Sequence, residues 1–169
     1  PKECGIATYS QDLIESLNKK FKNSFSVKIC ALETNVAKHI YDESIKYVLN
    51  TDQKNAFYHL SEKINADDLI QVVLIQHEFG LFIKNEANLI QFLYKTRKAV
   101  IIVFHTVLPN PNSSFKVNVQ VITQLAHSII VMTHSAAQIL INDYGVDSDK
   151  ITVIAHGTHL VQHSDKKLL

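Results

Sequence analysis

Short β-branched apolar runs alternate with amphipathic stretches along most of this chain. Runs such as VVLI at 72–75 and AVIIVF at 99–104 are typical of buried strands, and apolar residues three and four apart between them are typical of helices. The pattern predicts strands at 26–32, 45–49, 70–76, 99–104, 128–132 and 151–155. It predicts helices at 6–21, from an N-cap at Thr51 or Asp52 to about 65, and at 85–96, 113–126 and 134–144.

The order of these elements predicts the fold class. Short strands that alternate with longer helices imply βαβ units with right-handed crossovers. We therefore expect an α/β fold, a Rossmann-like three-layer domain with a mostly parallel sheet, formed by residues 1–169 as a single domain. Gly145 is placed to end the helix before it. The first helix follows Cys4-Gly5 with no strand ahead of it, so we expect the first strand of the sheet to be missing from this sequence.

The composition fits one globular domain and gives no support for nucleic-acid binding. Of 169 residues, 46% are hydrophobic and 20% are charged, which is enough for an ordinary buried core. The formal net charge of +1 offers no electrostatic attraction to nucleic acid. Lys166 and Lys167, near the end of the chain, are interpreted as solvated residues.

Cysteine content and hydropathy bear on the compartment. Cys4 and Cys30 are too few for a disulfide framework and indicate a reducing, cytoplasmic setting. Residues 1–9 lack the basic and apolar regions of a signal peptide. No apolar stretch approaches the roughly 20 residues that span a bilayer, which leaves peripheral membrane association open.

Four histidines stand where predicted apolar strands end: His77, His105, His134 and His156. Parallel strands present their carboxyl ends to one edge of the sheet, and open α/β sheets bind ligands in the crevice outside that edge. We therefore expect His77, His105 and His134 to lie along one edge, close to Gly5. Several imidazoles in consecutive βα units suggest a polar, hydrogen-bonding ligand.

These motifs differ in how specifically they indicate a function. His105 is the best functional candidate, because it follows the most apolar strand. The pair His77-Glu78 fits contacts with sugar hydroxyls or acid–base chemistry, and it equally fits a loop histidine beside a helix-capping glutamate. His134 is explained mostly by capping of the next helix through Thr133 or Ser135.

The remaining motifs are weaker. Gly5 at a helix N-terminus would let a phosphate approach free backbone N–H groups, although a glycine there is also an ordinary turn residue. His156, His159 and His163 lack the paired cysteines or carboxylates that would predict zinc, so we expect no metal. The chain has no P-loop, nucleophile elbow or complete dinucleotide fingerprint, which disfavours a nicotinamide-binding domain.

Several segments together resemble the N-terminal domain of retaining family-four glycosyltransferases of the two-domain GT-B type. The resemblance is closest to bacterial, mannosyltransferase-like "group 1" members. The segments are, in chain order, PKECGIATYSQDL, IQHEFGLF, VFHTVLP, IIVMTHSAAQIL and NDYGV followed by DKITVIAHGTH. The resemblance implies that this domain mostly holds the acceptor, that a C-terminal domain binds the nucleotide-sugar, and that no cofactor or metal is required.

The resemblance also implies roles for particular residues. Gly5 and Ile6 match the loop that approaches the donor diphosphate and sugar, and His105 matches the histidine that contacts the donor sugar near the reacting carbon. The cleft on the acceptor side would be lined by His77, Glu78 and His134. Retaining transfer develops positive charge on the sugar and negative charge on the diphosphate, which suits a helix N-terminus and neutral hydrogen-bond donors.

The sequence departs from the pattern of that family at several positions. Cys4-Gly5 stands where relatives carry two glycines, Ile83-Lys84 where they commonly carry glycines, and Ala155 where proline is common. The C-terminal donor-binding domain is absent from residues 1–169. The chain alone is therefore expected to be inactive.

The leading hypothesis is the acceptor-side domain of a nucleotide-sugar-dependent retaining glycosyltransferase. The full enzyme would transfer a hexose, with mannose as one candidate, to a glycan or lipid-linked acceptor. Its expected partners are the nucleotide-sugar as co-substrate, the acceptor and the missing C-terminal domain, and an open sheet edge leaves self-association open. Two alternatives remain: a non-catalytic binding or interaction module that retains the fold, and a small metal-dependent hydrolase that uses the histidines.

Overall fold

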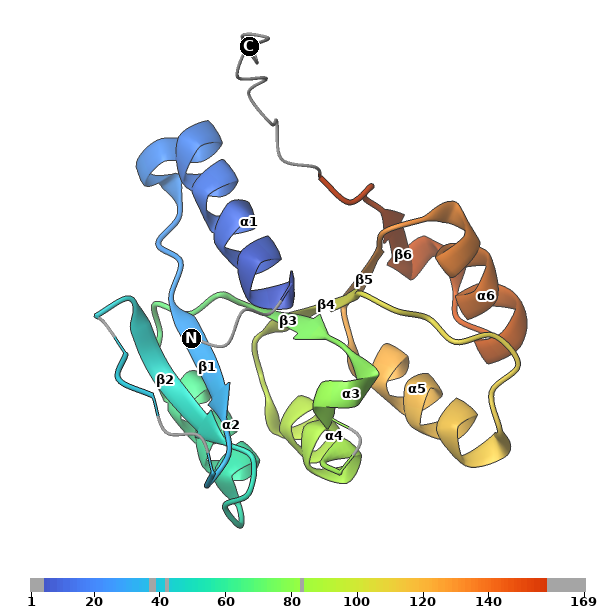
Figure 1. Cartoon of the computed structure of the whole chain (residues 1–169), viewed down its shortest axis with the longest axis horizontal. Helices are drawn as coiled ribbons and strands as arrows, with labels where there is room; N and C mark the ends of the chain where they lie inside the picture. The colour runs from blue at the N-terminus through green and yellow to red at the C-terminus, as the bar shows by residue number, and fades with distance from the viewer. Residues whose placement is uncertain (1–4, 37–38, 42, 83, 158–169) are drawn as a thin grey trace, which may run out of the picture.

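The computed structural model describes residues 5–36, 39–41, 43–82 and 84–157 (Figure 1). It has the predicted fold class, an α/β domain of the Rossmann-like three-layer type, and every strand pair within the described residues is parallel. The predictions for the following residues lie outside the described residues: Cys4, Ile83, His159, His163, Lys166 and Lys167.

The strands of the described residues form two parallel sheets. The smaller sheet pairs β1 (Ile29–Glu33) with β2 (Ile45–Asn50). The larger sheet has the order β3-β4-β5-β6, with bounds Val72–His77, Ala99–Phe104, Ser128–Val131 and Ile151–Val153. Its register aligns His77 with Phe104, Phe104 with Val131 and Val131 with Val153, so these strands end together at one carboxyl edge.

Helices cover both sides of the strands. They are α1 (Gly5–Phe21), α2 (Ala56–Ala66), α3 (Phe79–Phe82), α4 (Glu86–Lys95), α5 (Ser113–Leu125) and α6 (His134–Tyr144), with 3-10 turns at Lys22–Ser24 and Ser148–Lys150. The helices α2, α4, α5 and α6 pack in a row, each against the next. Helix α1 lies on the other side of the strands from α2, α4 and α5 (Figure 1).

The hydrophobic core lies between the larger sheet and the row of helices. Alternate side chains of β4, Val100, Ile102 and Phe104, are almost completely buried there. Because successive side chains of a strand point to opposite faces, this alternation fixes which residues of β4 face the helices. The other face of the sheet is the side on which α1 lies.

Most predicted boundaries agree with the structure to within three residues, but the predicted start of the second helix is wrong. Helix α2 begins at Ala56 after Asn55, whose φ is 62° and whose side chain makes no capping hydrogen bond. Thr51 and Asp52 instead bind the end of β1 and the turn that follows it. The Thr51 hydroxyl donates to the Glu33 carbonyl at 3.2 Å, and the Asp52 carboxylate accepts from the Asn35 N–H at 2.8 Å. The one-turn helix α3 is too short for periodicity to predict.

Two helix ends are stabilised by specific groups. Gly145 ends α6 with φ of 69°, as predicted, and its N–H donates to the Ile141 carbonyl. At the end of α5, the Lys150 ammonium donates to the carbonyls of Thr123, Gln124 and Ala126 at 3.2, 3.0 and 2.9 Å. These carbonyls lie in the last turn, where a cation also interacts favourably with the helix dipole.

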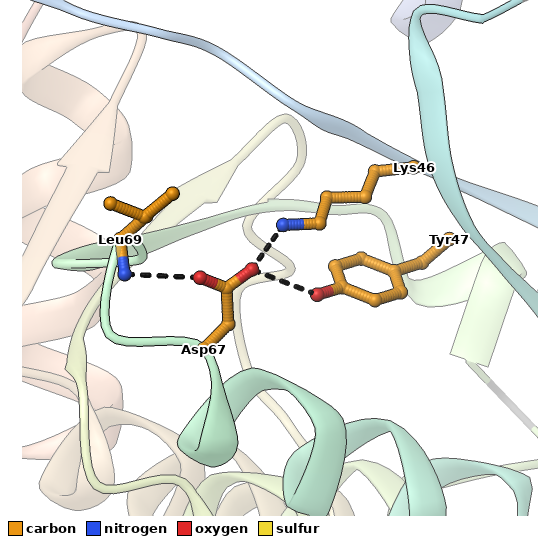
Figure 2. A network of polar contacts seen from close by, with 4 residues as sticks. All are labelled: Lys46, Tyr47, Asp67 and Leu69. Atoms are coloured by element: carbon orange, nitrogen blue, oxygen red, sulfur yellow. Dashed lines mark hydrogen bonds and ion pairs between the residues drawn. The ribbon is translucent and has the colours of Figure 1, made fainter.

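A polar network ties the smaller sheet to the turn between α2 and β3 (Figure 2). Lys46 of β2 forms an ion pair with Asp67, and the Tyr47 hydroxyl donates to the same carboxylate at 3.5 Å. The other oxygen of Asp67 accepts from the Leu69 N–H at 3.0 Å. The ion pair holds the pKa of Asp67 below its ordinary value and raises that of Lys46. The network therefore links β2 to the helix that connects it with the larger sheet.

Candidate functional site

His105 stands directly after β4 and is held at two points. Its backbone N–H donates to the His77 carbonyl at 3.0 Å, which continues the ladder between β3 and β4. Its ring Nε2 lies 2.7 Å from Gln76 Oε1. An amide oxygen only accepts, so Nε2 carries the proton and Nδ1 keeps a lone pair.

The environment of His105 favours the neutral form of its ring at pH 7. Partial burial lowers its pKa below the ordinary value of 6.5, Glu78 opposes this shift, and His156 adds to it. A half-buried imidazole with one nitrogen fixed and the other an acceptor can position a hydroxyl group. It carries no charge that would attract a phosphate.

Tyr9 brings the first helix to this histidine. Its ring packs edge-on to that of His105, with centroids 5.0 Å apart, and lies 5.1 Å from the ring of His156. The first turns of α1 therefore lie at the carboxyl edge of the larger sheet. Burial raises the pKa of Tyr9, so its phenol stays protonated at neutral pH.

Among the described residues, nothing covers the start of α1 at Gly5. Gly5 is its first residue and is exposed, and a Cβ built there would meet no atom within 4 Å. The first turn contains no acidic residue, and Ile6 is half-buried. Unpaired N–H groups at a helix start attract anions. Protein packing does not require glycine at this position.

Glu78 joins the loops that leave β3 and β4. Its carboxylate accepts from the Thr106 hydroxyl at 2.7 Å. Together, Gln76, Glu78, His105 and Thr106 form a polar group at the carboxyl ends of two adjacent strands.

His77 occupies a different environment from its neighbours. Only 1% of its surface is exposed. Its ring lies 4.9, 5.3 and 4.8 Å from those of Phe79, Phe82 and Phe104. Burial, and then repulsion from His105, lowers its pKa from 6.5 to about 4, with only its own backbone acting in the opposite direction. Within the described residues, its Nδ1 has no hydrogen-bond partner. The role of His77 in lining a cleft stays a prediction.

The predicted alignment of the histidines along one edge is confirmed. His77 ends β3, His105 follows β4, and His134 begins α6 after β5, and these strands are parallel and in register. His134 is exposed, and the cap of α6 is Thr133, whose hydroxyl accepts from the Ala136 N–H at 3.0 Å. Of the two capping candidates, Thr133 is thus the cap.

A cavity of about 380 Å³ lies among α3, the loop that follows β4 and the first turns of α4 and α5. The loops after β3 and β4 and the starts of α4 and α5 supply its lining, which is Phe79, Glu86, Leu108, Pro109, Asn110, Pro111, Asn112 and Phe115. The loop at 108–112 is held from behind, because the Tyr144 hydroxyl donates to the Leu108 carbonyl at 2.6 Å and Asp143 accepts from the Asn110 N–H at 2.9 Å. Apolar rings beside amides and a carboxylate are typical of small-molecule sites.

The sequence reasoning missed Gln76 and Tyr9. Gln76 precedes His77 on β3, where Val73 and Ile75 pack against the core. Period-two alternation then turns His77 toward the core and Gln76 toward the opposite face. That signal is present in the sequence, but the predicted strand stops at residue 76, one residue before the end of β3. Tyr9 gave no signal beyond its place in an apolar helical stripe.

The described residues show neither a metal-binding cluster nor a membrane-spanning helix. No group of three or more histidine, cysteine, aspartate or glutamate side chains among them is arranged to hold a metal ion. None of the helices in the described part of the chain has the length and hydropathy needed to cross a bilayer.

Comparison with known proteins does not assign a function to this site. No protein-family model matches the sequence, and no curated protein matches it.

Proposed function

We propose that this chain is the acceptor-side domain of a nucleotide-sugar-dependent retaining glycosyltransferase of the two-domain type. The observation that carries the proposal is the placement of His105. Its neutral ring is fixed by Gln76 at the end of β4 and packs against Tyr9 of α1. This brings a hydroxyl-binding group and an open helix N-terminus to the same edge of one sheet.

The two halves of that arrangement suit the two parts of a nucleotide-sugar. The diphosphate would approach the N–H groups at Gly5 and Ile6, where the helix dipole and the absence of a nearby carboxylate in the first turn favour an anion. The sugar would lie toward His105, whose Nδ1 would accept a hydrogen bond from a hydroxyl group. As the bond to the diphosphate lengthens, the helix N-terminus would stabilise the negative charge on the leaving group.

The cavity beside Phe79 and Phe115 supports an acceptor on this domain. It is lined by Phe79 of α3, by the starts of α4 and α5, and by the loop at 108–112 that follows β4. Aromatic rings can pack against the apolar face of a sugar, while Glu86 and Asn110 offer hydrogen bonds to its hydroxyls. His134, exposed at the same edge, would extend this surface.

Nucleotide-sugar binding tests the proposal on the chain itself. We expect weak binding of UDP- or GDP-hexoses in an NMR titration, with shifts at the start of α1 and at His105. Gly5→Ala should reduce the affinity roughly tenfold, the equivalent of about one hydrogen bond, because the new methyl group would block the backbone. The fold should not change, since this methyl group meets no protein atom.

Gly80→Ala is the matched control, because a Cβ at Gly80 also meets nothing within 4 Å. If the two substitutions lowered the affinity equally, the support for a donor site at α1 would be lost. The same holds if no UDP- or GDP-hexose bound to the chain. Detectable sugar transfer by the chain alone would contradict the expectation that a second domain is needed.

A donor screen on the full-length gene product distinguishes the alternatives. Transfer by the full-length protein supports the enzyme, and a folded full-length protein that binds glycans without transfer supports the interaction module. Bound zinc in the purified protein, together with hydrolysis, would favour the metal-dependent hydrolase. We assign the domain to the cytoplasm, where nucleotide-sugars would be available to it.

A further inference from the structure

The cavity lined by Phe79 and Phe115 presents a carboxylate to a ligand. Among the described residues of its lining, only Glu86 carries a formal charge, and the others are apolar residues and two asparagines. The nearest lysines in the sequence, Lys84 and Lys116, are not among these lining residues. A ligand in this cavity therefore meets a negative charge that no cationic side chain of the described lining neutralises.

Glu86 is oriented by a single hydrogen bond from the neighbouring helix. It is the first residue of α4 and is half-buried. Its Oε2 accepts from Asn118 Nδ2 of α5 at 2.7 Å, and within the described residues this side chain has no other polar partner. The start of a helix is a favourable place for a negative charge. The carboxylate is thus held by α5 and keeps its other oxygen, Oε1, for a ligand.

Two aromatic rings form an apolar part of the cavity. The ring centroids of Phe79 and Phe115 lie 4.6 Å apart, with the ring planes inclined by 55°. The position of Phe115 is fixed by its backbone N–H, which donates to the Asn112 side chain at 2.9 Å. An aromatic face attracts a cation electrostatically and also packs against the apolar face of a sugar. These rings therefore suit a ligand that combines an apolar face with a positive charge.

The carboxylate of Glu86 decides which polar group a ligand must offer. A carboxylate only accepts hydrogen bonds, so the ligand has to donate, and an anionic ligand would be repelled. A hydroxyl group donates one neutral hydrogen bond, whereas a protonated amine donates charge-assisted hydrogen bonds that are roughly twice as strong. A purely apolar ligand would leave Oε1 without a partner. A protonated amine is therefore the group that fits Glu86 best.

The start of α5 offers partners for hydroxyl groups. Asn110 lies in the loop before this helix and Asn112 is its N-cap, and both are exposed in the lining. Their side chains and the first N–H groups of the helix can bind hydroxyl groups. The first turn of α5 contains no acidic residue, whereas the negative charge of the cavity lies on Glu86 of α4. An ammonium group at Glu86 and hydroxyl groups toward α5 would match both sides of the cavity.

We propose that this cavity selects an amino sugar, a hexose with a free primary amine beside its hydroxyl groups, and that Glu86 determines this specificity. The ammonium group would bind Glu86, the apolar face of the ring would pack on Phe79 and Phe115, and the hydroxyl groups would lie toward the start of α5. The role of the amino sugar as the acceptor rests on the proposed function. The recognition of its ammonium group by Glu86 does not.

An NMR titration of the full chain with three methyl glycosides tests the inference at about pH 6.5, where an amine of this kind is protonated. The probes are methyl glucosaminide, methyl glucoside and methyl N-acetylglucosaminide, which differ only in the group at carbon 2 of the sugar. We expect the glucosaminide to bind roughly tenfold more tightly than the other two, with shifts at Glu86, Asn110 and Phe115. Glu86→Gln should abolish this preference, because its amide oxygen still accepts from Asn118 but carries no charge.

Glu62→Gln is the matched control, because Glu62 is an exposed glutamate of α2 outside the cavity lining, and this variant should keep the preference. Equal affinities for glucosaminide and glucoside would overturn the inference. So would a preference that survives Glu86→Gln, or no binding of any of the three glycosides. If Glu86→Gln does not fold, the unsubstituted chain is titrated at about pH 9.5 with the methyl groups of Leu108 as the signal. The amine is neutral there, and the preference must disappear.

The nucleotide-sugar titration separates a failure of this inference from a failure of the proposed function, since its signals are at Gly5 and His105. A preference for glucosaminide without any binding of UDP- or GDP-hexoses would support the amino-sugar site and remove the support for the transferase. Binding of a nucleotide-sugar without a preference among the three glycosides would overturn the specificity assigned to Glu86 and leave the donor site in place.

Discussion

The burial of His77 predicts a specific dependence of stability on pH. In the native protein its pKa is lowered to about 4, because burial and the nearby His105 disfavour the charged ring. In the unfolded chain it returns to about 6.5. The unfolded state therefore binds the extra proton first as the pH falls. The stability contributed by the neutral ring is complete above about pH 6.5 and is lost progressively toward pH 4.

The magnitude follows from the two pKa values. A tenfold change in proton affinity is about 1.4 kcal/mol, so the difference between 6.5 and about 4 corresponds to roughly 3 kcal/mol at full effect. His77→Leu removes the titrating group and keeps a similar volume. At neutral pH it loses ring contacts with the phenylalanines but also removes the unpartnered Nδ1, so we expect a net change within about 1.5 kcal/mol.

Urea denaturation at about pH 7, 6 and 5 measures this effect. The free energy of unfolding of the unsubstituted protein should decrease more steeply with falling pH than that of His77→Leu, and the difference between the two slopes isolates His77. His59→Gln is the control, because His59 is an exposed residue of α2 whose ring nitrogen contacts Glu62 and whose ring lies 5.6 Å from that of Tyr58. Parallel slopes for the protein and His77→Leu would refute the assigned pKa and its cause.

Three further predictions concern other parts of the molecule. Lys150→Met should lower the free energy of unfolding by roughly 1–3 kcal/mol in urea denaturation, because three carbonyls at the end of α5 lose their donor, and an unchanged midpoint would contradict that role. Burial raises the pKa of the Cys30 thiol from 9.0 to about 11, so less of the reactive thiolate is present in the folded chain. In a Cys4→Ser background near pH 8, iodoacetamide should therefore modify Cys30 about 100-fold more slowly in the folded chain than in the unfolded chain. Equal rates would show that the thiol is accessible and unperturbed. In the full-length gene product, His105→Ala should lower turnover about 100- to 1000-fold with little change in melting temperature, and near-normal turnover or an unfolded variant would make His105 a packing residue.

Local patterns in the sequence were sufficient for most of the elements and for their common edge. The strand at 99–104 and the helix at 134–144 have the predicted bounds, and Gly145 ends that helix as expected. These features depend on residues near one another in the chain, through side-chain period, capping hydroxyls and the backbone freedom of glycine. Parallel strands then place His77, His105 and His134 at one edge without any further information.

Tertiary structure decided which of these side chains are available to a ligand. The hydrogen bond from His105 to the His77 carbonyl extends β3 by one residue beyond the predicted end, and this puts His77 in the core and Gln76 beside His105. The contact of Tyr9 with His105 joins residues nearly a hundred positions apart, and no local pattern specifies it. Local sequence limits the conformations of each segment, whereas pairing and packing between distant segments determine the face to which a side chain points.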